Sequence, residues 1–195
     1  MKIEELPVHE SIKKIFLEEG IYELYPPQED AFRKTKVLNG GNLLMASPTA
    51  SGKTLVAEVC ALKHIIELNG KVLYTTPLKA LASEKYERFK RYEKLTKTNG
   101  DKIRVAVSTG DYDSSDPWLG KYDLIVTTYE KFDSLLRHGA SWVKELSLLV
   151  VDEIHYLGQG DRGPTLEVVL TRFRRFNSKG QILALSATVR NVEEI

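Results

Sequence analysis

The chain alternates short apolar runs with longer stretches in which apolar residues recur every three or four positions. The short runs are apolar at consecutive positions, which is typical of parallel strands covered on both faces. This alternation predicts an α/β fold, a doubly wound, mainly parallel sheet with helices on both faces. The predicted strands are 42–46, 71–76, 103–108, 123–127, 147–152 and 181–185. The predicted helices are 9–19, 52–68, 77–94, 129–138 and 164–176.

Length and composition narrow the class of protein. A chain of 195 residues predicts a single domain over residues 1–195. The 28 basic and 27 acidic residues give a net charge of +1, so any nucleic-acid binding must be local. Cys60 is the only cysteine, which excludes a disulfide framework and a cysteine-rich zinc site and favours an intracellular compartment. The four histidines are too scattered for metal ligation.

No apolar run approaches the length of about 18 residues that a membrane span needs, and the acidic N-terminus does not resemble a signal peptide. We therefore expect a soluble cytoplasmic protein with no membrane partner. Lys and Glu number 18 each against nine Asn plus Gln, a bias that is found in thermophile proteins.

The residues that close the first predicted strand resemble a phosphate loop. Ligands of such sheets bind beyond the carboxyl ends of the strands, and residues 47–54 read S-P-T-A-S-G-K-T between a strand and a helix. Gly52 would free backbone amides for phosphate, Lys53 would reach the β- and γ-phosphates, and Thr54 would ligate Mg²⁺. Ser47 replaces the usual leading glycine. The alternative is a helix start with an exposed lysine.

Two adjacent carboxylates, Asp152 and Glu153, close the fifth predicted strand. Buried carboxylates are costly without a partner or a role. Asp152 suits a Mg²⁺ position, and Glu153 suits orienting or deprotonating an attacking water. His155 would point to the same side as Glu153 if the strand continued. The alternative is a solvated strand end.

The sixth predicted strand ends in Ser186-Ala187-Thr188, which alone reads as a helix cap. Together with the phosphate loop and the D-E-I-H box at 152–155, it resembles the superfamily-2 DExH helicases. Further stretches are similar to the archaeal Hjm-type DNA repair helicases, and these are residues 26–28, 76–82, 108–112 and 127–131.

The resemblance implies a RecA-like P-loop domain that binds ATP and Mg²⁺. Residues 1–30 would hold an N-terminal helix and an adenine-reading segment, in which two prolines stiffen the loop before Gln28. The backbone amides of Ala50, Ser51 and Gly52 would hold phosphate, and many relatives have glycine at the position of Ala50. His155, Ser186 and Thr188 would couple the phosphate state to the nucleic acid.

The resemblance also implies nucleic-acid contacts at the remaining strand ends, each with a structural alternative. Thr76 and Pro77 read as an N-cap and a first-turn proline beside the contact residue Lys79. Gly110 and Asp111 are expected contacts after the third predicted strand, and the alternative there is an ordinary turn. Thr127 and Glu130 fit a capping box after the fourth predicted strand, which leaves Thr128 and Lys131 free as the expected contacts.

Two other sets of basic residues are interpreted as structural. Lys85 falls within the apolar stripe of its helix, so we expect its stem to lie along the surface with the ammonium in water, and the alternative is a functional role. Arg172, Arg174 and Arg175 lie off the apolar face of their helix and predict a solvated surface, with a contact to another domain or to nucleic acid as the alternative.

The function implied is the N-terminal motor domain of an ATP-dependent DNA helicase for DNA repair or replication restart, with 3′-to-5′ polarity. The partners would be single-stranded or forked DNA and a second RecA-like domain absent from this chain, in a monomer. On its own the chain would bind Mg-nucleotide weakly and hydrolyse it very slowly. The alternatives are a DExH RNA helicase, a non-catalytic nucleotide-gated binding module and, more remotely, a metabolic kinase.

Overall fold

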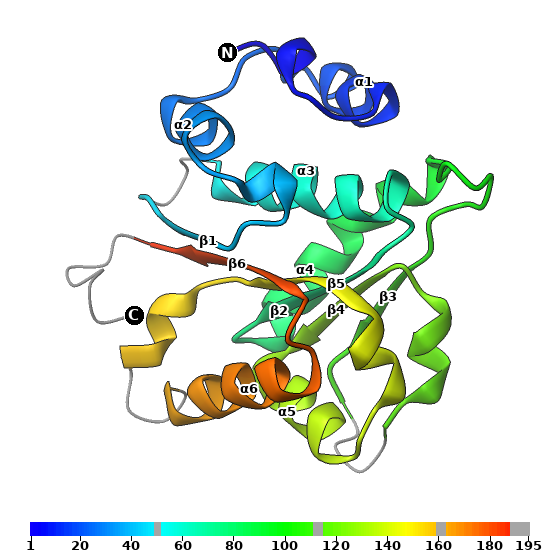
Figure 1. Cartoon of the computed structure of the whole chain (residues 1–195), viewed down its shortest axis with the longest axis vertical. Coiled ribbons are helices and arrows are strands. Elements are labelled where there is room, and N and C mark those ends of the chain that lie inside the picture. Colours follow the sequence, from blue (N-terminus) through cyan, green and yellow to red (C-terminus); the bar gives the residue numbers. More distant parts are fainter. Residues whose placement is uncertain (49–51, 111–114, 159–162, 188–195) are drawn as a thin grey trace.

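The computed structural model describes residues 1–48, 52–110, 115–158 and 163–187. Six strands form one sheet in the order β1-β6-β5-β2-β4-β3, and all neighbouring strands are parallel (Figure 1). Each predicted strand is confirmed, with ends that move by at most two residues. The strands are β1 (Leu43–Ala46), β2 (Lys71–Thr76), β3 (Val105–Ser108), β4 (Leu124–Thr128), β5 (Leu146–Val151) and β6 (Gln181–Ser186).

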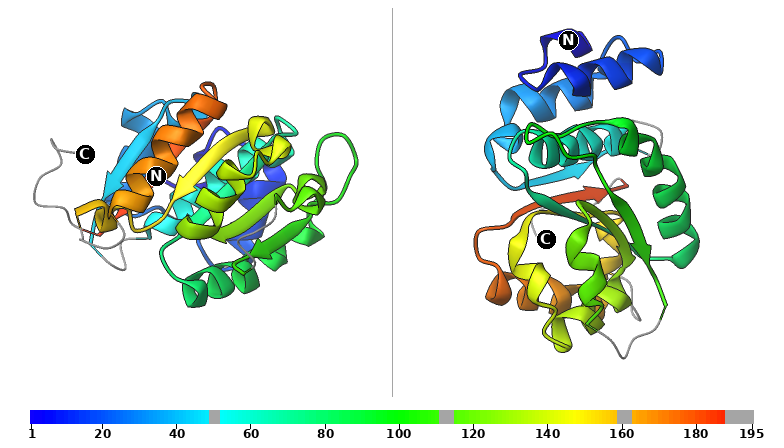
Figure 2. Two further views of the ribbon diagram at one scale, coloured as in Figure 1. Left: turned by 90° about the horizontal axis from the view of Figure 1, so that it is seen from below. Right: turned by 90° about the vertical axis from the view of Figure 1, so that its right-hand side faces the viewer.

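Helices cover both faces of the sheet, so the predicted fold class is confirmed. α3 and α4 pack on one face and α5 and α6 on the other, while α1 and α2 lie outside α3 (Figures 1 and 2). The α-helices are α1 (Glu10–Glu18), α2 (Pro26–Lys34), α3 (Lys53–Ile66), α4 (Lys79–Phe89), α5 (Tyr129–Arg137) and α6 (Gly163–Phe176). The 3₁₀-helices are η1 (Ile3–Glu5), η2 (Val37–Asn39), η3 (Lys90–Lys94), η4 (Pro117–Lys121), η5 (Ser141–Glu145) and η6 (Ile154–Gly158). Within the described ranges, no helix combines the length and apolar character that crossing a membrane requires.

The sheet separates two hydrophobic clusters, and successive residues of its strands enter alternate clusters. In β2, Val72 and Tyr74 join the cluster under α3 and α4, while Leu73 joins the one under α5 and α6. In β5, Leu148 and Leu149 divide in the same way. Each fully buried aliphatic side chain contributes about 1.5–3 kcal/mol, so both sides of each strand favour apolar residues. This is why the predicted strands read as unbroken apolar runs.

The segment before Gln28 is helical, which corrects the prediction of a loop stiffened by two prolines. Pro26 and Pro27 occupy the first positions of α2, and Gln28 follows in the first turn. Proline suits this place because its missing N–H has no partner there in any helix. The Gln28 side chain closes the turn by accepting the Tyr25 backbone N–H at 2.8 Å.

The helix predicted at 77–94 is shorter than expected at both ends. Leu78 is the extended N-cap of α4, and the Thr76 hydroxyl donates to the Leu78 carbonyl at 3.1 Å instead of capping the helix. After α4 the chain tightens into η3, where side chains three residues apart align. The buried rings of Phe89 and Tyr92 stack there, with centroids 5.9 Å apart.

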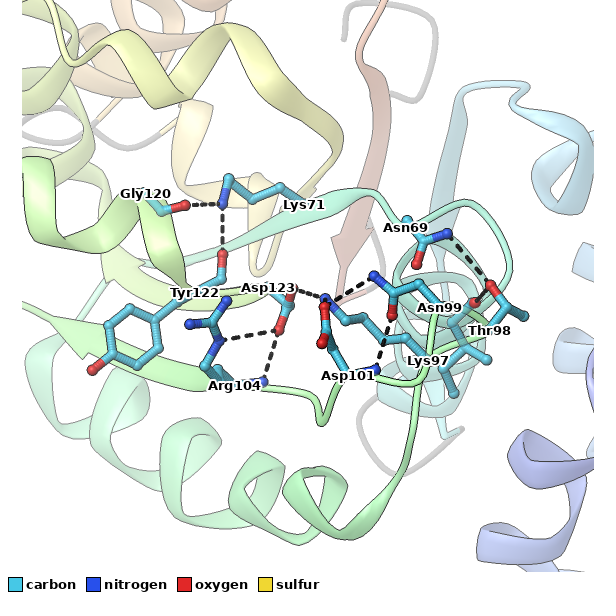
Figure 3. Close-up of polar contacts among 11 residues, drawn as sticks. Asn69, Lys71, Lys97, Thr98, Asn99, Asp101, Arg104, Gly120, Tyr122 and Asp123 are labelled. Carbon is cyan, nitrogen blue, oxygen red and sulfur yellow. Dashed lines mark hydrogen bonds and ion pairs between the residues drawn. The ribbon is translucent and has the colours of Figure 1, made fainter.

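At the amino ends of the strands, buried and half-buried charged groups bind partners within the fold. The Lys71 ammonium donates to the carbonyl oxygens of Gly120 and Tyr122 at 2.6 and 2.7 Å (Figure 3). The Lys97 ammonium lies 2.9 Å from a carboxylate oxygen of Asp123, and both residues are buried (Figure 3). We call Lys71, Lys97 and Asp123 the amino-edge cluster. Its charges are satisfied by fixed neighbours.

Candidate nucleotide-binding site

A pocket of about 870 Å³ lies at the carboxyl ends of the strands, the edge of the sheet where ligands of such folds bind. Its walls are residues 20–23 and 25, the first turn of α3 and one face of α4, with the residues that follow β5 at its floor. The lining side chains that carry polar chemistry are Tyr22, Glu23, Tyr25, Gln28, Lys53, Thr54, Glu84, Lys85, Arg88, Asp152 and Glu153.

Gly52 is required at the start of α3 by its backbone and by the space around it. Its φ of +74° lies in the left-handed region, and an added Cβ would lie 2.1 Å from Gln28 Nε2. The same nitrogen donates to the Gly52 carbonyl at 2.9 Å. Gln28 therefore ties α2 to the phosphate-loop segment, while Ala50 and Ser51 lie outside the described residues.

Lys53 is the first residue of α3, and its side chain folds back onto the preceding segment. The ammonium donates to the carbonyl oxygens of Ser47 at 2.6 Å and Pro48 at 3.0 Å, and the residue is 9% exposed. Hydrogen bonds from an ammonium to an anionic phosphate are stronger than those to neutral carbonyls. The present partners of Lys53 are therefore ones that a phosphate can replace.

Two tyrosines hold Asp152, which follows β5 directly. The Tyr74 hydroxyl donates to Asp152 Oδ2 at 2.7 Å, and the Tyr129 hydroxyl donates to the Asp152 carbonyl oxygen. Burial and the neighbouring Asp152 carboxylate raise the pKa of Tyr74 well above its usual value, which keeps the hydroxyl a donor. The sequence reasoning missed both tyrosines. Their only signal was their place at the carboxyl ends of β2 and β4.

Lys85 reaches the middle of the site, so the expectation that its ammonium lies in surface water is wrong. Its Nζ donates to Thr54 Oγ1 at 3.3 Å and lies 3.5 Å from Asp152 Oδ2, with the side chain 13% exposed. The two predicted Mg²⁺ ligands thus face one point. One hydroxyl and one carboxylate suit Mg²⁺, which takes further oxygens from phosphate and water. No group of three or more His, Cys, Asp or Glu side chains suited to a metal occurs in the described part.

Glu153 and His155 lie together, although not by the strand geometry that was expected. The chain leaves β5 at Val151, and Glu153 takes a left-handed φ of +57° before η6 begins at Ile154. His155 Nδ1 then lies 3.2 Å from Glu153 Oε2, without hydrogen-bond geometry. A turn therefore brings the two side chains together.

Ser186 ends β6 beside the start of the phosphate-loop segment. Its carbonyl accepts the Ser47 N–H at 3.2 Å, so the two strand ends are joined. The residue is fully buried, and its hydroxyl has no hydrogen-bond partner among the described residues. Thr188 lies outside those residues.

Two of the residues expected to contact nucleic acid are exposed after the ends of β2 and β3, which flank β4 in the sheet. Lys79 begins α4 after β2, and Gly110 follows β3. Asp111 lies outside the described residues. The structure thus leaves Lys79 and Gly110 accessible on the carboxyl side of the sheet.

The expectation of free Thr128 and Lys131 side chains is wrong. Thr128, not Thr127, caps α5 and accepts the Lys131 backbone N–H at 3.3 Å. The Thr127 hydroxyl instead donates to the Ser108 carbonyl at 2.7 Å. The Lys131 ammonium is fully buried and lies 2.9 Å from Asp116, a partner 15 residues earlier that no local pattern indicates.

The sequence matches a family model described as DEAD/DEAH box helicase over residues 25–195. The chain belongs to this family. Within the DEAD/DEAH box helicases it is similar to the ATP-dependent DNA helicase Hel308 of Thermococcus kodakarensis, with 56% identity over the whole chain, and of Pyrococcus abyssi, with 53%. It spans 16% and 26% of the lengths of these relatives. The resemblance to archaeal Hjm-type helicases is confirmed.

Solved helicase structures share the fold of this DEAD/DEAH box domain. A crystal structure of the DUF1998 helicase MrfA bound to DNA and AMPPNP superposes with a TM-score of 0.79 at 28% identity. It covers 96% of this chain, which covers 27% of MrfA. A second MrfA structure, bound to DNA, gives a TM-score of 0.77 at 27% identity. The RecA-like helicase fold expected from the resemblance is confirmed.

Proposed function

We propose that this chain is the first motor domain of a Hel308-type ATP-dependent DNA helicase, and that its pocket binds Mg-ATP. One observation carries the proposal. Thr54 Oγ1 and Asp152 Oδ2 lie within 3.5 Å of one point, beside the N-terminus of α3 and inside a pocket of nucleotide size. The names of the Hel308 relatives, which include ATP and DNA, support it.

In this function each side chain at the floor of the pocket has a separate task. Lys53 would leave the carbonyls of its own loop for the β- and γ-phosphates, while Thr54 and Asp152 would hold Mg²⁺. Mg²⁺ held there would supply positive charge to offset that of the phosphates. Glu153 would orient the attacking water and accept its proton. Gln28 would recognise the edge of the adenine base. His155, Ser186 and Thr188 would couple the state of the phosphates to the nucleic acid.

Single-stranded or forked DNA would cross the carboxyl ends of the strands that the pocket does not use. The exposed positions of Lys79 and Gly110 support contacts to the phosphate backbone there. We no longer propose direct contacts from Thr128 and Lys131, since both serve the fold in the structure. Their part would be to hold the start of α5.

We also propose that a second RecA-like domain of a longer protein completes the motor, in a monomer with 3′-to-5′ polarity. The chain spans only 16% and 26% of the lengths of its Hel308 relatives, which supports the presence of a further domain. An arginine from such a domain contributes roughly 10³–10⁵ in turnover in related reactions. Without it, the chain alone is expected to hydrolyse ATP very slowly.

Titration of a fluorescent ADP analogue tests the proposed function on this chain. Lys53→Ala should weaken binding in the presence of Mg²⁺ by at least about tenfold, because an ammonium–phosphate contact contributes roughly 1.5–3 kcal/mol. Lys63→Ala, in the last turn of the same helix and paired with Glu67, is the matched control and should bind as the wild type does. Equal affinities for all three proteins would contradict a phosphate site at Lys53.

A further inference from the structure

In the described part of the chain, Lys85 is the one residue that places a charge between Thr54 and Asp152, the two proposed metal ligands. It comes from α4, where Leu81, Glu84 and Arg88 also line the pocket at helical spacing. Arg88 has a fixed partner, because its Nη2 donates at 3.0 Å to Glu58, whose side chain is fully buried. The partners of Lys85 are instead groups of the site.

The ammonium of Lys85 has the surroundings of a cation site. It contacts Thr54 Oγ1 and Asp152 Oδ2, and it lies 5.8 Å from the centroid of the Tyr74 ring. Tyr74 donates its hydroxyl to the same carboxylate oxygen of Asp152. A single position therefore has a carboxylate, a hydroxyl and the face of an aromatic ring around it.

We propose that Lys85 is a built-in counter-ion of the nucleotide-free state, which exchanges with the Mg²⁺ that arrives with nucleotide. This inference rests on the proposed function. Asp152 is 7% exposed, so its carboxylate needs a cation nearby when no metal is bound. Two cations repel one another at this distance, so Mg²⁺ binding requires the ammonium to move away from Thr54 and Asp152. Lys85 thereby sets the Mg²⁺ concentration at which the site fills.

The test is a Mg²⁺ titration of this chain saturated with a fluorescent ADP analogue. Lys85→Met keeps the length of the side chain and removes its charge, so the half-saturating Mg²⁺ concentration should fall about tenfold. Lys85→Arg keeps the charge and should stay near the wild type. Lys90→Met, at the exposed C-terminal end of α4, is the matched control and should not change it.

A second measurement uses the nucleotide-free protein in EDTA. Lys85→Met should lower the melting temperature by about 3 °C, because Asp152 then keeps a buried charge without its cation. Adding Asp152→Asn to Lys85→Met should restore most of that loss.

The outcomes separate the inference from the proposed function. An unchanged or higher half-saturating Mg²⁺ concentration in Lys85→Met would overturn the exchange while leaving Mg-nucleotide binding intact. If even the wild type bound the analogue without any response to Mg²⁺ or to Lys53→Ala, the proposed function would fail, and the exchange with it.

Discussion

The two edges of the sheet hold buried charges in different ways. In the amino-edge cluster, Lys71 and Lys97 end on backbone carbonyls and on Asp123, which are fixed in the fold. At the carboxyl edge, Lys53 and Lys85 end on a loop segment and on groups that face a pocket of about 870 Å³.

Desolvation of a lysine is therefore a poor guide to function in this protein. Partial burial lowers the pKa of Lys71, which is typical of a desolvated ammonium, and yet its contacts are structural. What distinguishes the carboxyl edge is that its partners face a pocket, where phosphate and metal would replace them in the proposed function. Mutations at the amino edge should therefore change the stability of the fold, and mutations at the carboxyl edge should change nucleotide binding and hydrolysis.

The largest expected effect is at the carboxyl edge, from Glu153→Gln in the longer protein that carries this chain. Loss of the carboxylate should reduce ATP hydrolysis by about 10²–10⁴-fold, because glutamine orients a water but does not take its proton. Nucleotide binding should persist, measured by the same fluorescent titration. Equal hydrolysis by mutant and wild type would remove Glu153 from the chemistry and favour a non-catalytic binding module.

A smaller effect, on stability and not on hydrolysis, is expected from Lys97→Met at the amino edge. Asp123 would keep a buried charge without its ammonium partner, at a cost of roughly 3 kcal/mol in the free energy of unfolding. Urea unfolding measures this loss, and adding Asp123→Asn should recover much of it. Nucleotide affinity should not change. A large loss of affinity would show that the two edges are not independent.

The smallest effect is a pH dependence at the amino edge. His64 Nε2 lies 2.7 Å from Gln181 Oε1, Nδ1 has no hydrogen-bond partner among the described residues, and burial lowers the pKa of the imidazole. The unfolded chain therefore takes up a proton near pH 6.5 that the folded protein resists, so stability is lost as pH falls below that value. His64→Gln should flatten the fall between pH 7 and 5.5, measured by urea unfolding. An identical slope in both proteins would contradict this.

The sheet was predictable because its strands are covered on both faces, which leaves a local signature in the sequence. The places of Lys53 and Thr54 at the start of α3 and of the carboxylate pair after β5 were predictable, because each motif follows a strand. Two helix starts were harder. The Pro26-Pro27 pair fits a stiff loop as well as a first helical turn, and Thr128 instead of Thr127 caps α5 because β4 runs one residue further.

The contacts that complete the site were not predictable, because they join residues distant in sequence. Tyr74 meets Asp152 across neighbouring strands, and Lys85 meets Thr54 across two helices. A helical pattern shows that Lys85 shares a face with apolar residues, but not that this face covers the start of α3. The ion pair of Lys131 with Asp116 was not predictable either, because no local pattern indicates which partner the lysine has.

The backbone at Glu153 carries a last consequence. A glutamate at φ +57° is strained where glycine would not be, by an amount on the order of 1 kcal/mol. Glycine at position 153 would relieve this strain, but it would also remove the carboxylate that the proposed hydrolysis requires. The left-handed turn after β5 therefore trades a small loss of stability for an acidic side chain at the floor of the pocket.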